Sequence, residues 1–301
     1  MRKIRRYLIL LRPFTLLAPL IVSLSVMTAS YVYASTRFLP LLSLFWSMVP
    51  ACLCLAVLNG ASNALNQAAD YREDCLSKPY RPLPQRLVTV REAYWAALML
   101  YGIAIGCAFL VNFLFAGFVI GIALFTVTYS LGPRMKRFLV INQLWVALPR
   151  GLFGILASWS VFADPFQSMP LAIGGIASAF LFGGTATKDV LDAAADRMVG
   201  THTLCNVVGV RTTAVVSTGI MVASFAAVIP LVFLGVLPGT FIALAGLMLC
   251  GVLIGVLLLR GSRSRSWENT NAWLAMYVTY FFFTISFACL TIVSSFASQA
   301  A

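Results

Sequence analysis

Six side chains that carry oxygen atoms, arranged at helical spacing, are the residues of this chain best suited to chemistry. They form two trios: Asn66, Asp70 and Asp74, followed by Asp189, Asp192 and Asp196. On an α-helix, residues three or four positions apart share a face, so each trio presents its oxygen atoms along one stripe. Two acidic stripes that face each other repel unless cations lie between them. Such oxygen ligands suit Mg²⁺, which usually completes its shell with phosphate oxygens and water.

Basic side chains follow or flank both trios. They are Arg72, Lys78, Arg81, Lys136, Arg137, Lys188 and Arg197. Guanidinium and ammonium groups pair well with phosphate oxygens. Carboxylates, a divalent metal and bases together indicate a diphosphate site, where the metal neutralises the leaving diphosphate and favours C–O cleavage. In a membrane protein, this combination suggests a diphosphate ester with a lipid tail.

Two other interpretations of the acidic residues remain open. Each acid could be a solvated loop charge or pair with an arginine at a helix end. A transporter also uses intramembrane acids together with cations. However, six of the nine acidic residues fall in the two short stretches around the trios. Solubility alone does not account for that concentration.

The composition places these residues in a polytopic membrane protein. The 301 residues are 61% hydrophobic and 10% charged, with a mean hydropathy of +0.94. The apolar runs are roughly 17–25 residues long and do not alternate, which predicts an all-α protein with membrane-spanning helices. The seven Cys residues fit no metal-ligand spacing. The basic residues lie in short loops between the apolar runs, which argues against nucleic-acid binding.

Nine membrane spans are predicted, within a single membrane domain over residues 1–301. They cover 14–34, 43–64, 93–112, 115–131, 141–162, 169–188, 212–235, 239–259 and 271–296. A cleaved signal peptide is the alternative interpretation of the first span. Nearly all of the 21 Lys and Arg residues lie on one side of these spans, which predicts a cytoplasmic N-terminus. Both trios follow even-numbered spans, so the loops 66–92 and 188–211 would form a cytoplasmic cap over the active site.

The motifs resemble those of the UbiA superfamily of intramembrane prenyltransferases. The first motif of that family, roughly N-D-x-x-D-x-x-x-D, matches Asn66, Asp70 and Asp74, and its K-P-x-R-P turn matches 78–82. The second motif, an Asp-rich run followed by G-x-x-T-L, matches 189–204. A Tyr-Ser-x-x-Pro-x-x-Lys segment matches 129–136. The resemblance covers most of the chain.

The resemblance implies a nine-helix bundle around a central cavity and Mg²⁺-dependent transfer of a prenyl group. The donor would be a prenyl diphosphate, and the acceptor an aromatic or other lipophilic molecule. By analogy, each trio holds one Mg²⁺. The implied catalytic residues are Asp70, Asp74, Asp192, Asp196 and Lys136. The implied diphosphate-binding residues are Arg72, Lys78, Arg81, Tyr129, Arg137, Lys188 and Arg197.

Some residues depart from the family pattern or allow two interpretations. Gln67 stands where the family usually has Asp, so the first site would lose a carboxylate, and Ala194-Ala195 replaces a common Glu-Gly. Arg150, inside the fifth span, either contacts a substrate or extends to the membrane interface. His202 would be a catalytic base or, as we favour, a structural loop residue. Gly183-Gly184 allows close helix approach or a bend.

Two further functions remain as alternatives. Without an acceptor, an allylic cation could close on the double bonds of its own prenyl chain, which would make the protein a membrane terpene cyclase. A non-catalytic carrier or transporter of lipid diphosphates would move the substrate without releasing diphosphate.

Overall fold

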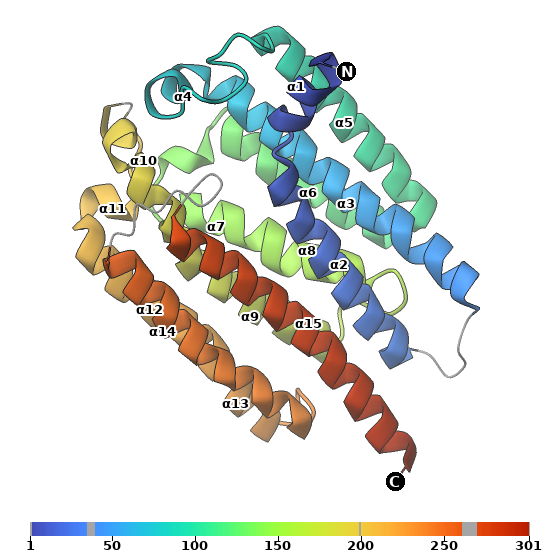
Figure 1. Cartoon of the computed structure of the whole chain (residues 1–301). Helices are drawn as coiled ribbons and strands as arrows, with labels where there is room; N and C mark the ends of the chain where they lie inside the picture. Colours follow the sequence, from blue (N-terminus) through green and yellow to red (C-terminus); the bar gives the residue numbers. More distant parts are fainter. Residues whose placement is uncertain (1, 35–39, 199, 261–269, 301) are drawn as a thin grey trace.

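The computed structural model describes residues 2–34, 40–198, 200–260 and 270–300, and all regular secondary structure in these ranges is helical. The long helices run side by side between two ends of the molecule (Figure 1). They are α2 (Pro13–Ala34), α3 (Leu41–Ala69), α5 (Val90–Val111), α6 (Phe113–Ser130), α9 (Ser168–Gly184), α12 (Gly209–Ala226), α14 (Met248–Leu259) and α15 (Asn271–Ala300). The short helices α1 (Arg2–Leu10), α4 (Tyr71–Ser77), α10 (Ala186–Met198) and α11 (Leu204–Val207) gather at one end.

Eight helical stretches in the described ranges are long and apolar enough to cross a membrane. Two of them join neighbouring elements: Ser168–Leu191 runs from α9 into α10, and Gly239–Leu259 consists of a 3-10 helix (Gly239–Leu247) followed by α14. The expected fifth span, 141–162, is helical but not one regular helix. It consists of α7 (Ile141–Leu148), a π-helical turn (Pro149–Phe153) and α8 (Gly154–Trp159). Pro149 explains the break, because proline has no N–H to donate and its ring crowds the carbonyl one turn earlier. The α-helical pattern is interrupted where Arg150 lies.

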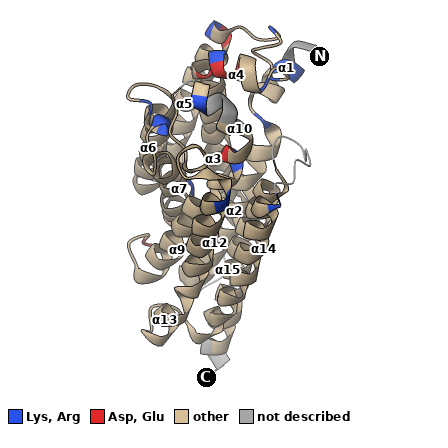
Figure 2. Cartoon of the chain, turned by 90° about the vertical axis from the view of Figure 1, so that its left-hand side faces the viewer, with Lys and Arg blue, Asp and Glu red and all other residues tan. Residues whose placement is uncertain are grey.

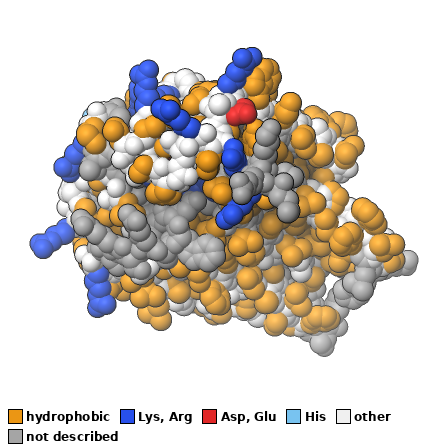
Figure 3. Space-filling view, turned by 45° about the horizontal axis from the view of Figure 1, so that its top comes forward, with side chains coloured by type: hydrophobic (Ala, Val, Ile, Leu, Met, Phe, Trp, Pro, Cys, Tyr) orange, Lys and Arg blue, Asp and Glu red, His pale blue; other side chains and the backbone are white. Residues whose placement is uncertain are grey.

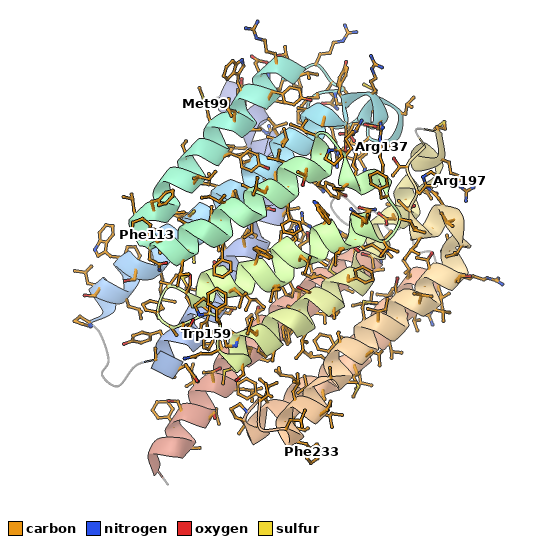
Figure 4. The ribbon with its side chains drawn as sticks, turned by 180° about the vertical axis from the view of Figure 1, so that it is seen from behind. Met99, Phe113, Arg137, Trp159, Arg197 and Phe233 are labelled. Atoms are coloured by element: carbon orange, nitrogen blue, oxygen red, sulfur yellow. The ribbon has the colours of Figure 1, made fainter. Side chains whose placement is uncertain are left out.

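Charged residues of the described part gather at the end that carries α4 and α10 (Figure 2). The same end, seen from above, shows Lys and Arg side chains at its margin, whereas hydrophobic side chains cover the adjoining flank (Figure 3). Phe113 and Phe233 lie near the opposite end and Met99 lies on the outer side of α5 (Figure 4), and all three are exposed. An apolar flank suits the interior of a bilayer, and a charged end suits its aqueous surface.

Two hydrophobic clusters hold the helices together. One joins α2, α9, α12 and α15 and includes Phe180, Phe225 and Phe283, and the other joins α3, α5 and α6 and includes Leu58 and Phe115. The pair Gly183-Gly184 lies at a close helix contact, and the expected sixth span, 169–188, also breaks directly after it, because α9 ends at Gly184 and α10 begins at Ala186. A Cβ atom on Gly183 would lie 2.8 Å from the carbonyl oxygen of Ser217. Only glycine allows this approach of α9 to α12.

Candidate active site

The first trio lies where α3 passes into α4. Asn66 is in the last turn of α3, Asp70 is the junction residue, and Asp74 is on α4. The backbone N–H of Asp70 donates to the carbonyl of Asn66 (2.9 Å), and that of Asp74 donates to the carbonyl of Asp70 (2.8 Å). The helical spacing expected from the sequence is therefore kept across the junction. Asp70 is 8% exposed and Asp74 is 3% exposed.

Basic side chains from two loops neutralise these carboxylates. One guanidinium nitrogen of Arg81 lies 2.7 Å from Asp74 Oδ2. Lys136 forms an ion pair with Asp70, and Arg134 bridges Asp70 (2.9 Å) and Glu73 (3.1 Å). Lys136 comes from the loop between α6 and α7, so the site joins segments far apart in the sequence. Burial raises the pKa of the Asp74 carboxyl, and the neighbouring Arg81 guanidinium opposes that rise.

The second trio lies on α10, which packs against α4. Asp189 is in the first turn of α10 and is 3% exposed. The adjacent Lys188 donates a hydrogen bond to the hydroxyl of Tyr129 (2.8 Å), which donates to Asn142 Oδ1 (3.0 Å). The backbone of α10 includes Asp192 and Asp196, but their side chains lie outside the described residues.

A polar cavity of about 1370 Å³ of empty space brings most of the predicted residues together. The predicted residues that line it are Asn66, Asp70, Asp74, Lys78, Arg81, Tyr129, Lys136, Lys188 and Asp189. Two segments nearly 120 positions apart, α3–α4 and α10, thus contribute carboxylates to one space. The spacing argument placed each trio on a helix, and the fold brings Asp189 to the same cavity as the first trio.

Three predicted diphosphate ligands do not line this cavity. Arg72, Arg137 and Arg197 are exposed, and Figure 4 shows Arg137 and Arg197 at the charged end of the molecule. These three arginines lie in loops or near helix ends, where the sequence gives no information on the direction of a side chain. His202 is also exposed and absent from the lining, and its backbone N–H donates to the carbonyl of Arg137 (3.2 Å).

Sequence reasoning missed three functional candidates. Arg12 and Glu73 line the polar cavity, and Arg134 pairs with two of its carboxylates. Arg12 and Arg134 both have left-handed backbone angles, with φ of 56° and 57°. Arg12 precedes Pro13, and a residue before proline is disfavoured in the α region, so the sequence offered a signal for an irregular backbone at this position. Non-glycine residues with this conformation are uncommon and often mark functional positions.

An apolar cavity of about 860 Å³ of empty space adjoins the polar one. Residues such as Ala18, Val22, Leu58 and Leu181 line it. The two cavities share seven lining residues: Thr15, Ser62, Thr126, Val146, Pro149, Arg150 and Tyr277. A ligand with a charged head and an apolar tail fits this arrangement. Arg150 lies at the boundary, which favours the substrate-contact interpretation over extension to the interface.

Gln67 has a structural role that the sequence did not show. It is 1% exposed, does not line the polar cavity, and its Nε2 donates to the carbonyl of Leu10 (2.6 Å). A carboxylate at this position could not donate that bond, since an ionised carboxylate is only an acceptor. The position at which a carboxylate was expected to be missing therefore faces the N-terminal helices and not the polar cavity.

The donor chemistry of the polar cavity fits Mg²⁺. Among the described side chains, no three His, Cys, Asp or Glu residues are grouped closely enough to form a complete metal site. However, Mg²⁺ commonly takes only one or two carboxylates and completes its octahedral shell with water and phosphate oxygens. Asn66, Asp70, Asp74 and Asp189 supply hard oxygen donors to one cavity, with no sulfur or imidazole among them.

A model of the UbiA prenyltransferase family matches residues 22–286. The chain belongs to the UbiA prenyltransferase family. This UbiA family member is 32% identical over 209 residues to the probable homogentisate phytyltransferase 2, chloroplastic, of Oryza sativa subsp. japonica, covering 65% of this chain and 54% of that protein. It is 32% identical over 203 residues to the homogentisate solanesyltransferase, chloroplastic, of Arabidopsis thaliana, covering 62% of this chain and 52% of that protein. The matched region spans about half the length of these two relatives.

Solved structures share the fold of this UbiA family member over nearly its whole length. A UbiA homologue from Archaeoglobus fulgidus, bound to DMAPP and Mg²⁺, has a TM-score of 0.70 and 19% identity over 96% of this chain and 99% of that one. A structure described as digeranylgeranylglyceryl phosphate synthase in membranes has a TM-score of 0.67 and 16% identity, over 98% and 99% of the two chains. At this identity, the likeness establishes the fold.

Proposed function

We propose that this protein transfers a prenyl group from a prenyl diphosphate to an aromatic or other lipophilic acceptor in a Mg²⁺-dependent reaction. The observation that carries the proposal is the direct junction between a polar cavity with carboxylates and bases and an apolar cavity inside the bundle. The diphosphate head fits the first and the prenyl tail fits the second. Relatives named as phytyl- and solanesyltransferases, and a UbiA homologue bound to DMAPP and Mg²⁺, support the same substrate class.

The residues of the polar cavity have separate proposed roles. Lys78, Arg81, Lys136 and Lys188 bind diphosphate oxygens, with Tyr129 holding Lys188 in place. Asn66, Asp70 and Asp74 hold one metal ion, and Asp189 together with Asp192 and Asp196 holds the other. Bound Mg²⁺ would neutralise charge on the diphosphate and make it a better leaving group. The exposed Arg72, Arg137 and Arg197 are proposed to attract the anionic substrate rather than to contact it.

The reaction follows from this placement. The C1–O bond breaks, its electron pair goes to the diphosphate, and an allylic cation remains at the junction of the cavities. The apolar walls exclude water, which would otherwise capture the cation. An acceptor carbon donates a π electron pair to C1, and the acceptor then loses a proton to the released diphosphate or to water.

We also propose a topology for the protein in the membrane. The broken segment Ile141–Trp159 would cross the bilayer as a ninth span, in addition to the eight long helices. The charged end would face the cytoplasm together with the N-terminus and the active site, since Lys and Arg favour that side. Residues 1–301 would form one membrane domain, in which 66–92 and 188–211 cap the polar cavity.

The test incubates the purified protein with Mg²⁺ and a panel of prenyl diphosphates, with and without phenolic acceptors. Diphosphate release and organic products are measured together. We expect prenylated acceptor, and we expect Asp70→Ala and Asp189→Ala to lose most of the turnover. Asp164→Ala is the matched control, because this carboxylate is exposed in a loop remote from the cavity.

Three results would contradict the proposal in different ways. Full turnover by both cavity variants would show that the proposed metal-site residues are wrong. Release that needs no acceptor and yields cyclic hydrocarbons would make the protein a cyclase. Movement of labelled prenyl diphosphate across vesicles without diphosphate release would make it a transporter.

A further inference from the structure

Three amide side chains on α3 form an amide ladder that holds the corner between α1 and α2. The ladder consists of Asn59, Asn63 and Gln67, which are four residues apart and therefore share one face of α3. Asn59 Nδ2 donates to the carbonyl of Thr15 (3.0 Å), and Gln67 Nε2 donates to that of Leu10 (2.6 Å). Between them, Asn63 Nδ2 donates to the carbonyl of Leu11 (2.9 Å) and to Thr15 Oγ1 (2.8 Å). Figure 1 shows this corner beside the end of α3.

The carbonyls that the amide ladder binds are those that the local helices cannot satisfy. Leu10 is the last residue of α1, and the final carbonyls of a helix have no partner within it. The carbonyl of Thr15 would bond to the N–H four residues later, but that residue is Pro19. Leu10 and Thr15 are buried, and a buried carbonyl without a partner costs free energy comparable to a lost hydrogen bond. The amide ladder therefore stabilises an irregular backbone whose carbonyls would otherwise be unsatisfied.

Arg12 is the residue that this irregular backbone presents to the polar cavity. Its φ is 56°, in the left-handed region that a non-glycine residue adopts only where its surroundings enforce it. Thr15 donates to the carbonyl of Arg12 from both its backbone N–H (2.8 Å) and its Oγ1 (2.8 Å). Since Asn63 donates to that same Oγ1, the ladder connects to Arg12 through two successive hydrogen bonds. Arg12 lines the polar cavity and does not line the apolar one.

We infer that the amide ladder, in which Asn63 lines the polar cavity and Gln67 faces α1, positions Arg12 to bind the diphosphate group of the substrate. Gln67 and Asn63 are positioning residues, and Arg12 is the residue that contacts the ligand. The inference rests on the proposed function. It explains why an amide, and not a carboxylate, is suitable at position 67: only the amide can donate to Leu10.

The test is a double-mutant cycle with inorganic diphosphate as the probe. Calorimetric titration in the presence of Mg²⁺ gives Kd for the wild type, Arg12→Ala, Gln67→Met and the double variant. Removing a charged hydrogen-bond donor is expected to raise Kd roughly tenfold or more for Arg12→Ala. We expect Gln67→Met to raise Kd several-fold, and to add less than about twofold when Arg12 is already alanine. With a prenyl diphosphate, the same variants should raise KM more than they lower kcat.

The matched control is Asn112→Asp. Asn112 Nδ2 also donates to a backbone carbonyl, that of Ser160 (2.9 Å), while its Oδ1 caps α6 by accepting from Phe115 N–H (2.8 Å). The aspartate keeps the cap and loses the donor, at a place that does not line the polar cavity. This variant should keep the wild-type Kd. Gln67→Glu provides a second variant with the same loss of donor, in case Gln67→Met does not fold.

The outcomes separate this inference from the proposed function. If the wild type binds no inorganic diphosphate and releases none from prenyl diphosphates, both are wrong. If the wild type binds diphosphate and the effects of Arg12→Ala and Gln67→Met multiply, Gln67 does not act through Arg12 and only the inference is wrong. An unchanged Kd in Arg12→Ala would likewise contradict the inference, and it would not contradict the proposed function.

Discussion

One guanidinium nitrogen of Arg81 contacts both oxygens of Asp74, at 2.9 Å from Oδ1 and 2.7 Å from Oδ2. Both side chains are largely buried, with 10% and 5% of their surfaces exposed. A buried carboxylate is costly to keep ionised without a neighbouring cation. The loop after α4 therefore supplies a charge that the first trio needs.

We expect Arg81→Met to destabilise the protein by about 3 kcal/mol, because it leaves a buried carboxylate without its cation. Adding Asp74→Asn should restore much of that stability and leave the protein inactive. Thermal unfolding in detergent measures the first effect, and diphosphate release measures the second. Arg72→Gln, at an exposed arginine of α4, should change stability by less than about 0.5 kcal/mol. If the double variant is no more stable than Arg81→Met, the buried pair is not the cause.

We expect Tyr129→Phe to lower kcat/KM roughly tenfold. The hydroxyl accepts from Lys188 and donates to Asn142, so its loss frees the ammonium group and leaves an amide oxygen without this donor. Steady-state kinetics with a prenyl diphosphate checks this, and Tyr94→Phe is the control, since Tyr94 is exposed on α5. Equal kinetics for both variants would show that the hydroxyl of Tyr129 does not orient Lys188.

We expect Ala18→Phe to shift substrate preference toward shorter prenyl diphosphates. Ala18 lines the apolar cavity, and a phenyl ring there takes space from a long chain. Relative kcat/KM values across a chain-length series measure the shift. Val215→Phe adds the same ring on an exposed part of α12 and should leave the order of preference unchanged. An equal loss of kcat/KM for all chain lengths would show that the prenyl tail does not occupy the apolar cavity.

Removal of divalent metal should abolish diphosphate release and be reversed by Mg²⁺. The carboxylates of the polar cavity repel a diphosphate, and a divalent cation between them would offset this repulsion in addition to the lysine and arginine side chains. Chelation followed by Mg²⁺ titration measures the dependence. In Asp70→Asn, half-maximal activity should need more Mg²⁺ than in the wild type. Full activity in the presence of chelator would contradict the proposed chemistry.

Helical periodicity predicted which side chains of the candidate site share a helix face. Asn66, Asp70 and Asp189 line one cavity because a spacing of three or four residues fixes the face on which a side chain lies. The spacing could not show that Gln67 points to α1, since no local pattern identifies the carbonyls that a neighbouring helix leaves unsatisfied. Those partners depend on how α1 and α2 meet α3.

Loop residues were predicted less well for a physical reason. Arg137 and Lys136 are adjacent in sequence, yet only Lys136 lines the cavity. A loop has no fixed period, and loop bases in membrane proteins also serve as orientation signals. The break in the fifth span could have been predicted from the sequence, because Pro149 has no N–H to donate within a helix.

The hydrogen bond from Asn59 to the carbonyl of Thr15 has a consequence for how this sequence evolves. Asn59 supplies the donor that the Thr15 carbonyl lacks because Pro19 has no N–H. Substituting either residue alone therefore changes how this carbonyl is paired. A non-proline residue at 19 would restore the helical N–H donor to the Thr15 carbonyl, and the half-buried Asn59 amide would lose its place as the donor to that carbonyl. An apolar residue at 59 would leave the carbonyl without a donor. Proline in the first long helix and an amide on the facing helix should therefore be gained and lost together as such sequences diverge.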